Sequence, residues 1–179
     1  NFLKQKSLTL KKWWKPNIDI KKGITYPDAV NLIKEKFLTS IYRNLRSDVP
    51  IGATLSGGID SSSIVCGMRH IEPDMEINTF SYIDENKNVS EEKWVDKINK
   101  FTNSKENKIY LNDKDLINDF DDLIKTQGEP FGGPSIYAQY RVFKKINERN
   151  IKVTLDGQGA DELLGGYNGF PGYRMHSLL

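Results

Sequence analysis

The sequence predicts an α/β fold, in which a parallel sheet is covered by helices on both faces. Short apolar runs rich in β-branched residues alternate with stretches in which apolar residues recur every three or four positions. This alternation is typical of βαβ units, whose strands run parallel. Ligands bind beyond the carboxyl ends of such strands, so we expect a site in the loops after Leu55, Ile83 and Leu155.

The individual elements follow from the same two periodicities. A helical pattern begins after Tyr26-Pro27-Asp28 and continues to Leu45. We expect strands at residues 49–55, 77–83, 108–111 and 151–155. We expect further helices at residues 61–70, 91–101, 115–125 and 135–150.

Composition excludes several classes of function. The 179 residues carry 26 Lys and Arg against 24 Asp and Glu, a net charge of +2, which does not indicate a nucleic-acid partner. One cysteine, Cys66, and two histidines, His70 and His176, argue against a disulfide framework and most zinc sites. No apolar run approaches the roughly 18 residues of a membrane helix, and the first residues lack a signal-peptide core. We therefore expect a cytoplasmic protein without a membrane partner.

Lysines are concentrated in the first 22 residues, where Asp19 is the sole acid. Leu8, Leu10, Trp13 and Trp14 alternate or cluster with these lysines, as in an edge strand followed by a connector that ends at Pro16. A polyanion-binding arm is the alternative interpretation.

The loop after the first strand reads Ser56-Gly57-Gly58-Ile59-Asp60-Ser61-Ser62. Adjacent glycines let a ligand approach the main chain, and hydroxyls beside the N–H groups of a helix start form a cradle for an anion. Asp60 would repel a phosphate unless a cation such as Mg²⁺ lay between them. The Walker and nucleophile-elbow patterns are both absent, and an ordinary glycine turn with a polar helix cap is the alternative.

The loop after the last strand is rich in glycines and acids. It reads Asp156-Gly157-Gln158-Gly159-Ala160-Asp161-Glu162-Leu163-Leu164-Gly165-Gly166-Tyr167. Asp161 follows the strand end by six residues, where it can face Asp60 across the carboxyl edge of the sheet. Two carboxylates beside a phosphate site suit Mg²⁺. The alternative is a solvated acidic loop.

Both loops carry a family resemblance. The segment S-G-G-I-D-S-S resembles the pyrophosphate loop of the N-type ATP pyrophosphatases, or PP-loop proteins. The second loop is similar to S-G-E-G-x-D-E-x-x-G-G-Y of the asparagine synthetase family, and E-P-F-G-G-P-S-I-Y at residues 129–137 also looks like a segment of that family. The resemblance implies an adenine nucleotide alpha hydrolase-like fold with a sheet of the five-stranded type. Residues 25–179 would be a C-terminally incomplete synthetase domain, and residues 1–24 the tail and linker of a preceding domain.

The resemblance also implies ATP and Mg²⁺ as cofactors and assigns site residues. The implied nucleotide-binding positions are Leu55, Ser56, Gly57, Gly58, Asp60, Ser61, Ser62, Tyr82, Asp156 and Gly157. Asp60 and Asp161 match the metal ligands and, with Gln158, the catalytic positions. Tyr82 stands where a small aliphatic residue is common, so we expect its main chain to matter.

The implied reaction is that of asparagine synthetase. The β-carboxylate of aspartate attacks the α-phosphorus of ATP, which gives β-aspartyl-AMP and pyrophosphate, and ammonia then forms asparagine. Gln158 replaces the common Glu, and an amide is a poor general base. A β-lactam-synthetase-like ligase with another acceptor therefore stays open. So do a nucleotide-binding module without turnover and a basic-tailed interaction domain.

In the family, a glutaminase domain with an N-terminal cysteine supplies the ammonia. Residue 1 is Asn here, and Cys66 lies beside Ile64 and Val65 at an apolar position of a predicted helix. We therefore expect this chain to lack the glutaminase domain and its activity. The other expected partners are small molecules, namely ATP, aspartate and glutamine-derived ammonia; a homodimer is left open.

Overall fold

A computed structural model describes residues 10–17, 23–86 and 90–178. The chain divides into two compact units, residues 1–35 and residues 36–179. The sheet and both glycine-rich loops belong to the second unit. The predicted domain boundary after residue 24 remains a prediction.

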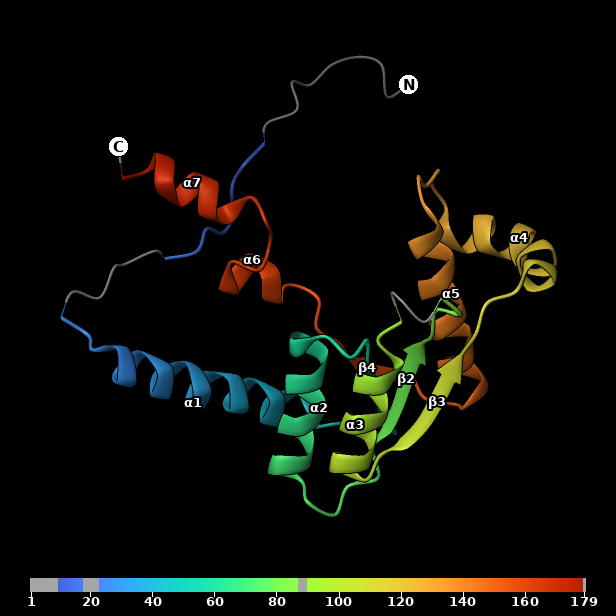
Figure 1. Ribbon diagram of the computed structural model, residues 1–179, viewed down its shortest axis with the longest axis horizontal. Coiled ribbons are helices and arrows are strands. Elements are labelled where there is room, and N and C mark those ends of the chain that lie inside the picture. The colour runs from blue at the N-terminus through green and yellow to red at the C-terminus, as the bar shows by residue number, and fades with distance from the viewer. Residues whose placement is uncertain (1–9, 18–22, 87–89, 179) are drawn as a thin grey trace. The chain divides into compact units, whose positions relative to one another are not determined.

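In the second unit, single helices alternate with the first three strands, and a pair of helices follows the third strand and again the fourth (Figure 1). The helices are α1 (Tyr26–Asn44), α2 (Ile59–Ile71), α3 (Glu92–Thr102), α4 (Asp113–Gln127), α5 (Pro134–Glu148), α6 (Ala160–Leu164) and α7 (Phe170–His176), of which α1 begins in the first unit. The strands are β1 (Ile51–Thr54), β2 (Asn78–Tyr82), β3 (Lys105–Ile109) and β4 (Val153–Leu155).

The strands form one parallel sheet in the order β3-β2-β1-β4. Ala53 of β1 aligns with Thr79 on one side and with Leu155 on the other. The predicted parallel α/β fold is confirmed. The described residues supply four strands, whereas the family resemblance implied five.

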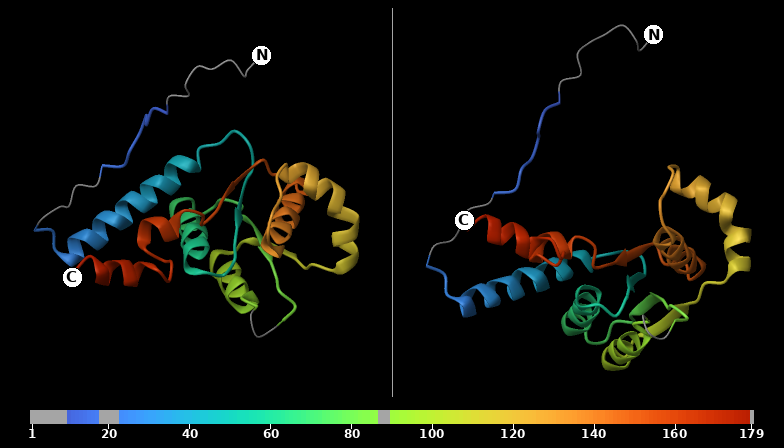
Figure 2. Two further views of the ribbon diagram at one scale, coloured as in Figure 1. Left: turned by 90° about the horizontal axis from the view of Figure 1, so that it is seen from above. Right: turned by 45° about the horizontal axis from the view of Figure 1, so that its top comes forward.

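Helices cover both faces of the sheet (Figure 2). On one face, α2 and α3 pack onto apolar residues of β1, and the buried cluster includes Ala53, Leu55, Val65 and Val95. On the other face, α5 contributes Val142 and Ile146 to a second cluster with Phe80, Ile109 and Ile151. Two separate apolar layers therefore hold the strands from both sides.

Gly52 shows why β1 can lie beneath that second cluster. A Cβ atom at Gly52 would stand 3.1 Å from the Phe80 ring and 3.3 Å from Ile151 Cγ2. The missing side chain leaves room for the Phe80 ring between β1 and α5, where Phe80 is 1% exposed.

Three details differ from the sequence expectations. Residues 10–17 have no regular secondary structure, while residues 1–9 of the expected edge strand lie outside the described residues. Strand β3 begins at Lys105, three residues before its expected start. The second glycine-rich loop includes the short helix α6, and α7 follows it. Among the described helices, none has the length and apolar character needed to cross a membrane.

Candidate functional site

A cavity of about 570 Å³ lies beyond the carboxyl ends of β1, β2 and β4. Its walls come from the loops after those strands, from the start of α2 and from α5. Its lining includes Leu55, Ser56, Gly58, Asp60, Ser61, Tyr82, Asp84, Ser90, Glu91, Ala138, Gln139, Val142, Phe143, Asp156, Gly157, Gln158 and Asp161.

The loop after β1 closes around two hydroxyl groups. The oxygens Ser56 Oγ and Ser61 Oγ lie 3.0 Å apart. Ser61 Oγ accepts from the Ser56 N–H at 3.2 Å, and Ser56 Oγ accepts from the Gly58 N–H at 3.2 Å. Gly58 is the N-cap of α2 and has no side chain to cap the helix. Because the first N–H groups of a helix lack carbonyl partners, the helix start offers donors for an anionic ligand.

Gly57 fixes this loop against the beginning of α3. Its φ of 89° lies in the left-handed region, which a residue with a side chain rarely adopts. A Cβ atom there would also meet Glu91 O at 3.1 Å and Trp94 Cβ at 3.2 Å. Glycine is therefore required twice, by backbone conformation and by close contact.

The two glycine-rich loops touch at Gly157. A Cβ atom at Gly157 would stand 3.0 Å from Ser61 N and 3.1 Å from Asp60 Cβ. The pairing of β4 with β1 brings the loop after β4 to this place, because parallel strands end at the same edge of a sheet. The absence of a side chain at Gly157 lets the second loop lie directly on the start of α2.

Local contacts shape the second loop. Asp156 Oδ1 accepts a hydrogen bond from the Gln158 N–H at 3.0 Å. Asp161 lies in the first turn of α6, where the helix end favours a negative charge. A Cβ atom at Gly166 would overlap the Asp161 carboxylate, so the glycine leaves that carboxylate its place.

Most sequence-predicted site residues line the cavity. They are Leu55, Ser56, Gly58, Asp60, Ser61, Tyr82, Asp156, Gly157, Gln158 and Asp161. Gly57 and Ser62 do not line it. Gly57 instead contacts α3, and the Ser62 N–H donates to Gly58 O at 3.1 Å within the helix start.

The cavity is acidic. Its lining includes five carboxylates, which belong to Asp60, Asp84, Glu91, Asp156 and Asp161. Within the described part of the chain, none of the lining residues is Lys or Arg. Among the described residues, positive charge from a bound cation would favour the binding of a polyanion here.

The donor set fits Mg²⁺. This ion takes oxygen ligands and is commonly held by one or two carboxylates together with substrate phosphates. Asp60 and Asp161 both line the cavity and would supply the carboxylate oxygens. Among the described residues there is no group of three or more ligating side chains, so phosphate oxygens and water would have to complete the coordination.

Tyr82 lines the cavity at the end of β2. Its hydroxyl donates to Asp84 Oδ2, which belongs to another lining residue, at 3.3 Å. Burial and the nearby Asp84 carboxylate raise the pKa of Tyr82, so the phenol stays protonated and remains a donor at neutral pH.

Sequence reasoning missed the residues that α5 contributes to the wall, namely Ala138, Gln139, Val142 and Phe143. It also missed Asp84, Ser90 and Glu91. The position of Asp84 just after β2 was a usable signal, because that loop lies at the carboxyl edge of the sheet. No local pattern marks the α5 residues, since a helical period does not tell which face lines a cavity.

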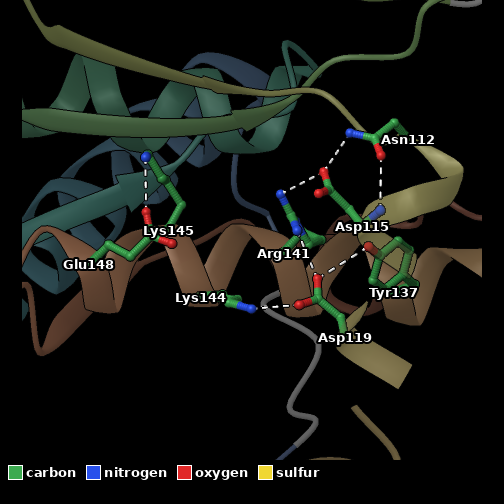
Figure 3. A network of polar contacts seen from close by, with 8 residues as sticks. All are labelled: Asn112, Asp115, Asp119, Tyr137, Arg141, Lys144, Lys145 and Glu148. Carbon is green, nitrogen blue, oxygen red and sulfur yellow. Dashed lines mark hydrogen bonds and ion pairs between the residues drawn. The ribbon is translucent and has the colours of Figure 1, made fainter. Parts of the chain in front are cut away.

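Other residues with notable chemistry lie outside the cavity lining. Tyr137 is 6% exposed and donates to Asp119 Oδ2 at 3.2 Å (Figure 3). Tyr167 donates to Glu162 Oε1 at 2.7 Å. Cys66 is half-buried on α2, and burial raises the pKa of its thiol.

Comparisons with known proteins identify a family for most of the chain. Residues 32–178 match the family model described as asparagine synthase. A putative asparagine synthetase [glutamine-hydrolyzing] 2 of Methanocaldococcus jannaschii is 33% identical over 143 residues, which are 79% of this chain and 27% of that protein. Asparagine synthetase [glutamine-hydrolyzing] 1 of Bacillus subtilis is 33% identical over 170 residues, which are 90% of this chain and 25% of that protein.

The fold has a counterpart among solved structures. An NH3-dependent NAD synthetase from Campylobacter jejuni superposes with a TM-score of 0.51 at 18% identity, over 77% of this chain and 60% of that one. This likeness concerns the fold alone. The chain spans about a quarter of the length of its curated relatives. From the family match over residues 32–178, the chain belongs to the asparagine synthase family.

Proposed function

We propose that this chain is the part of an amide-forming ligase that binds ATP, adenylates aspartate and releases pyrophosphate. One observation carries the proposal: Gly157 lies against Asp60 and Ser61, so the hydroxyl-rich loop and the acidic loop form adjoining walls of one cavity. Membership in the asparagine synthase family supports this reaction class. In the relatives, the region that matches this chain is about a quarter of the protein.

In this proposal the loop after β1 binds the pyrophosphate part of ATP. The hydroxyls of Ser56 and Ser61 and the N–H groups around Gly58 donate to phosphate oxygens. Gly57 holds the loop in place through its contact with α3, and Ser62 belongs to the same helix start. The remaining nucleotide contacts come from Leu55, Tyr82, Asp156 and Gly157.

Asp60 and Asp161 would hold Mg²⁺ against the phosphates. When bound, the ion neutralises charge on the phosphate oxygens and on the departing pyrophosphate. The acidic lining without Lys or Arg among the described residues supports this requirement for a cation.

The reaction has two steps. A carboxylate oxygen of the acceptor attacks the α-phosphorus, the bond from that phosphorus to the β-bridging oxygen breaks, and pyrophosphate leaves. Ammonia then attacks the carbonyl carbon of the acyl adenylate, AMP leaves, and the ammonia nitrogen loses a proton. The cavity contributes by holding the carboxylate in line with the leaving pyrophosphate.

Gln158 would orient the acceptor or the acyl adenylate. Its main chain is held by Asp156, and its side-chain amide has both a donor and an acceptor. An amide does not take up the proton from ammonia at neutral pH. Water or the phosphate group of the departing AMP therefore has to do so. This substitution favours a second candidate, a family ligase that uses a carboxylic acid other than aspartate.

The wider setting is part of the proposal. Ammonia would come from glutamine through a glutaminase domain. The use of ATP and aspartate suits a cytoplasmic enzyme, and a homodimer is an assembly to be tested by light scattering.

The test is ATP–pyrophosphate exchange dependent on aspartate, measured on this chain. Exchange that appears with aspartate and is lost in Asp60→Asn supports adenylation. Binding of ATP without exchange under any acceptor supports a nucleotide-binding module instead. Exchange with another carboxylic acid but not with aspartate keeps the reaction class and replaces the acceptor.

A further inference from the structure

One carboxylate joins α4 to α5. The Asp119 side chain on α4 is 5% exposed and is contacted by three side chains of α5 (Figure 3). Arg141 Nη1 lies 2.7 Å from Asp119 Oδ2, and Lys144 Nζ lies 2.5 Å from Asp119 Oδ1. The Tyr137 hydroxyl donates to Asp119 Oδ2 at 3.2 Å. We call these four residues the Asp119 network.

The network is extended at the beginning of α4. Arg141 Nη2 lies 3.1 Å from Asp115 Oδ2, so one guanidinium bridges two carboxylates of α4. Asn112 caps the same helix by accepting from the Asp115 N–H at 2.9 Å, and its amide donates to Asp115 Oδ2 at 2.7 Å. Helices α4 and α5 are thereby tied by directional, charged contacts.

The two halves of α5 are held differently. In the second half, Val142 and Ile146 pack into the apolar cluster with Phe80 and Ile109 of the sheet. In the first half, the buried side chain is Tyr137, and its polar atom bonds to Asp119. The beginning of α5 therefore has its buried contact with α4, whereas the remainder of the helix contacts the sheet and, through Arg141 and Lys144, also α4.

The first half of α5 is also part of the cavity wall. Ala138 and Gln139 line the cavity, and they follow Tyr137 directly in the helix. Successive helix positions are about 100° apart, so Ala138 and Gln139 lie about 100° and 200° round the helix from Tyr137, away from the side that faces Asp119. A rotation of the helix that broke the network would also move Ala138 and Gln139.

We propose that Asp119 is a positioning residue for the nucleotide cavity, which acts through Tyr137, Arg141 and Lys144 to hold Ala138 and Gln139 in the wall. The role rests on the proposed function, because ATP is taken as the ligand. Among the described residues, Asp119 lies outside the cavity lining, and its hydrogen bonds and ion pairs go to α5 rather than to the glycine-rich loops. Its loss should therefore change how well the cavity fits ATP while the phosphate-binding loops stay intact.

Asp119→Asn tests this role. The variant leaves the Arg141 and Lys144 charges beside a neutral group and weakens their hold on α4. We expect the dissociation constant for Mg-ATP to rise about 3- to 10-fold, measured by calorimetry well below the unfolding temperature. In the exchange assay the KM for ATP should rise by the same factor while kcat changes little, because the metal-binding carboxylates are untouched.

Glu148→Gln is the matched control. It removes the ion pair in which Lys145 Nζ lies 2.9 Å from Glu148 Oε2. This pair is on the same helix, at the end remote from Tyr137. The control should bind Mg-ATP as wild type does. Tyr137→Phe removes a single hydroxyl of the network and replaces Asp119→Asn if that variant does not fold; it should weaken binding about twofold.

The results separate the two proposals. If wild type does not bind Mg-ATP, the proposed function fails, and the role of Asp119 in nucleotide binding fails with it. If wild type binds but Asp119→Asn, or Tyr137→Phe in its place, binds equally well, the positioning role alone is overturned. The positioning role is also overturned if Glu148→Gln weakens Mg-ATP binding equally, or if Asp119→Asn lowers kcat alone.

Discussion

The cavity has two kinds of wall. The loop wall, formed by residues 55–61 and 156–161, consists of two glycine-rich loops, which lie so close that a Cβ atom at Gly157 would stand 3.0 Å from Ser61 N. The helix wall, formed by Ala138, Gln139, Val142 and Phe143 of α5, is built from side chains on a helix that α4 and the sheet hold. The loop wall leaves little freedom to its residues, while the helix wall depends on residues that do not line the cavity. The two walls should respond differently to substitution.

The largest effect is expected from the carboxylates of the loop wall. Asp60→Asn or Asp161→Asn should reduce Mg-dependent affinity for ATP by about 100-fold or more, because even the outer partners of metal ligands change metal affinity by 10- to 100-fold. Titration with ATP in the presence and absence of Mg²⁺ measures it. Retention of the magnesium effect in both variants would remove these residues from the metal site.

A smaller loss is expected from crowding the contact between the loops. Gly157→Ala places a methyl group 3.0 Å from Ser61 N, so the loops must separate by a few tenths of an ångström. We expect about tenfold weaker ATP binding with little change in the melting temperature. Gly132→Ala is the control, because no atom lies within 4 Å of its new methyl group. Similar results for both variants would mean that the contact at Gly157 does not matter for binding.

Gly166→Ala, also in the second glycine-rich loop, should have a smaller effect than Gly157→Ala. The added methyl group occupies the place of the Asp161 carboxylate, which can turn away because it ends a flexible side chain. The concentration of Mg²⁺ needed for half-maximal ATP binding should rise about threefold. Gly172→Ala, whose methyl group meets open space, should leave it unchanged. If both variants need the same Mg²⁺ as wild type, Asp161 is not held by this contact.

The smallest effect is expected for the helix wall, in how Asp119 affects unfolding at low pH. Burial alone would raise the pKa of Asp119, but hydrogen bonds and charge from Lys144 and Arg141 outweigh it and lower the pKa below its ordinary value. The stability that Asp119 provides is complete above the ordinary carboxyl pKa near 4 and is lost as pH falls through the lowered value. Asp119→Asn should therefore shift the midpoint of acid unfolding by only about 0.3 pH units while removing part of the pH dependence. Circular dichroism from pH 7 to pH 2 follows it, and parallel acid curves for both proteins would contradict the network.

The same contrast explains what the sequence could predict. The glycines and acids of the loop wall are local signals, because each close contact requires a small residue at one position, as at Gly57 and Gly157. The periodicities of 2 and 3.6 likewise predict the parallel sheet and its main helices. The helix wall is a product of tertiary packing, and Gln139 has no feature in the sequence that distinguishes it from a surface residue.

Strand β3 illustrates a second limit. Its first residues, Lys105, Glu106 and Asn107, are polar and have low strand propensity. They form a strand because Lys105 pairs with Asn78 of β2 and Asn107 donates to Thr79 O at 3.1 Å. A neighbouring strand supplies these contacts, so the expectation from residues 108–111 began too late.

The pairing of β4 with β1 has a consequence for folding kinetics. Ile51 aligns with Val153, so the two strands that carry the loop wall are separated by most of the second unit. Contacts of such large sequence separation require the closure of a long chain loop and form slowly. During synthesis, β1 leaves the ribosome long before its partner does. Nucleotide binding should therefore be among the last properties that the folding chain acquires, after the β1–β2–β3 part of the sheet is in place.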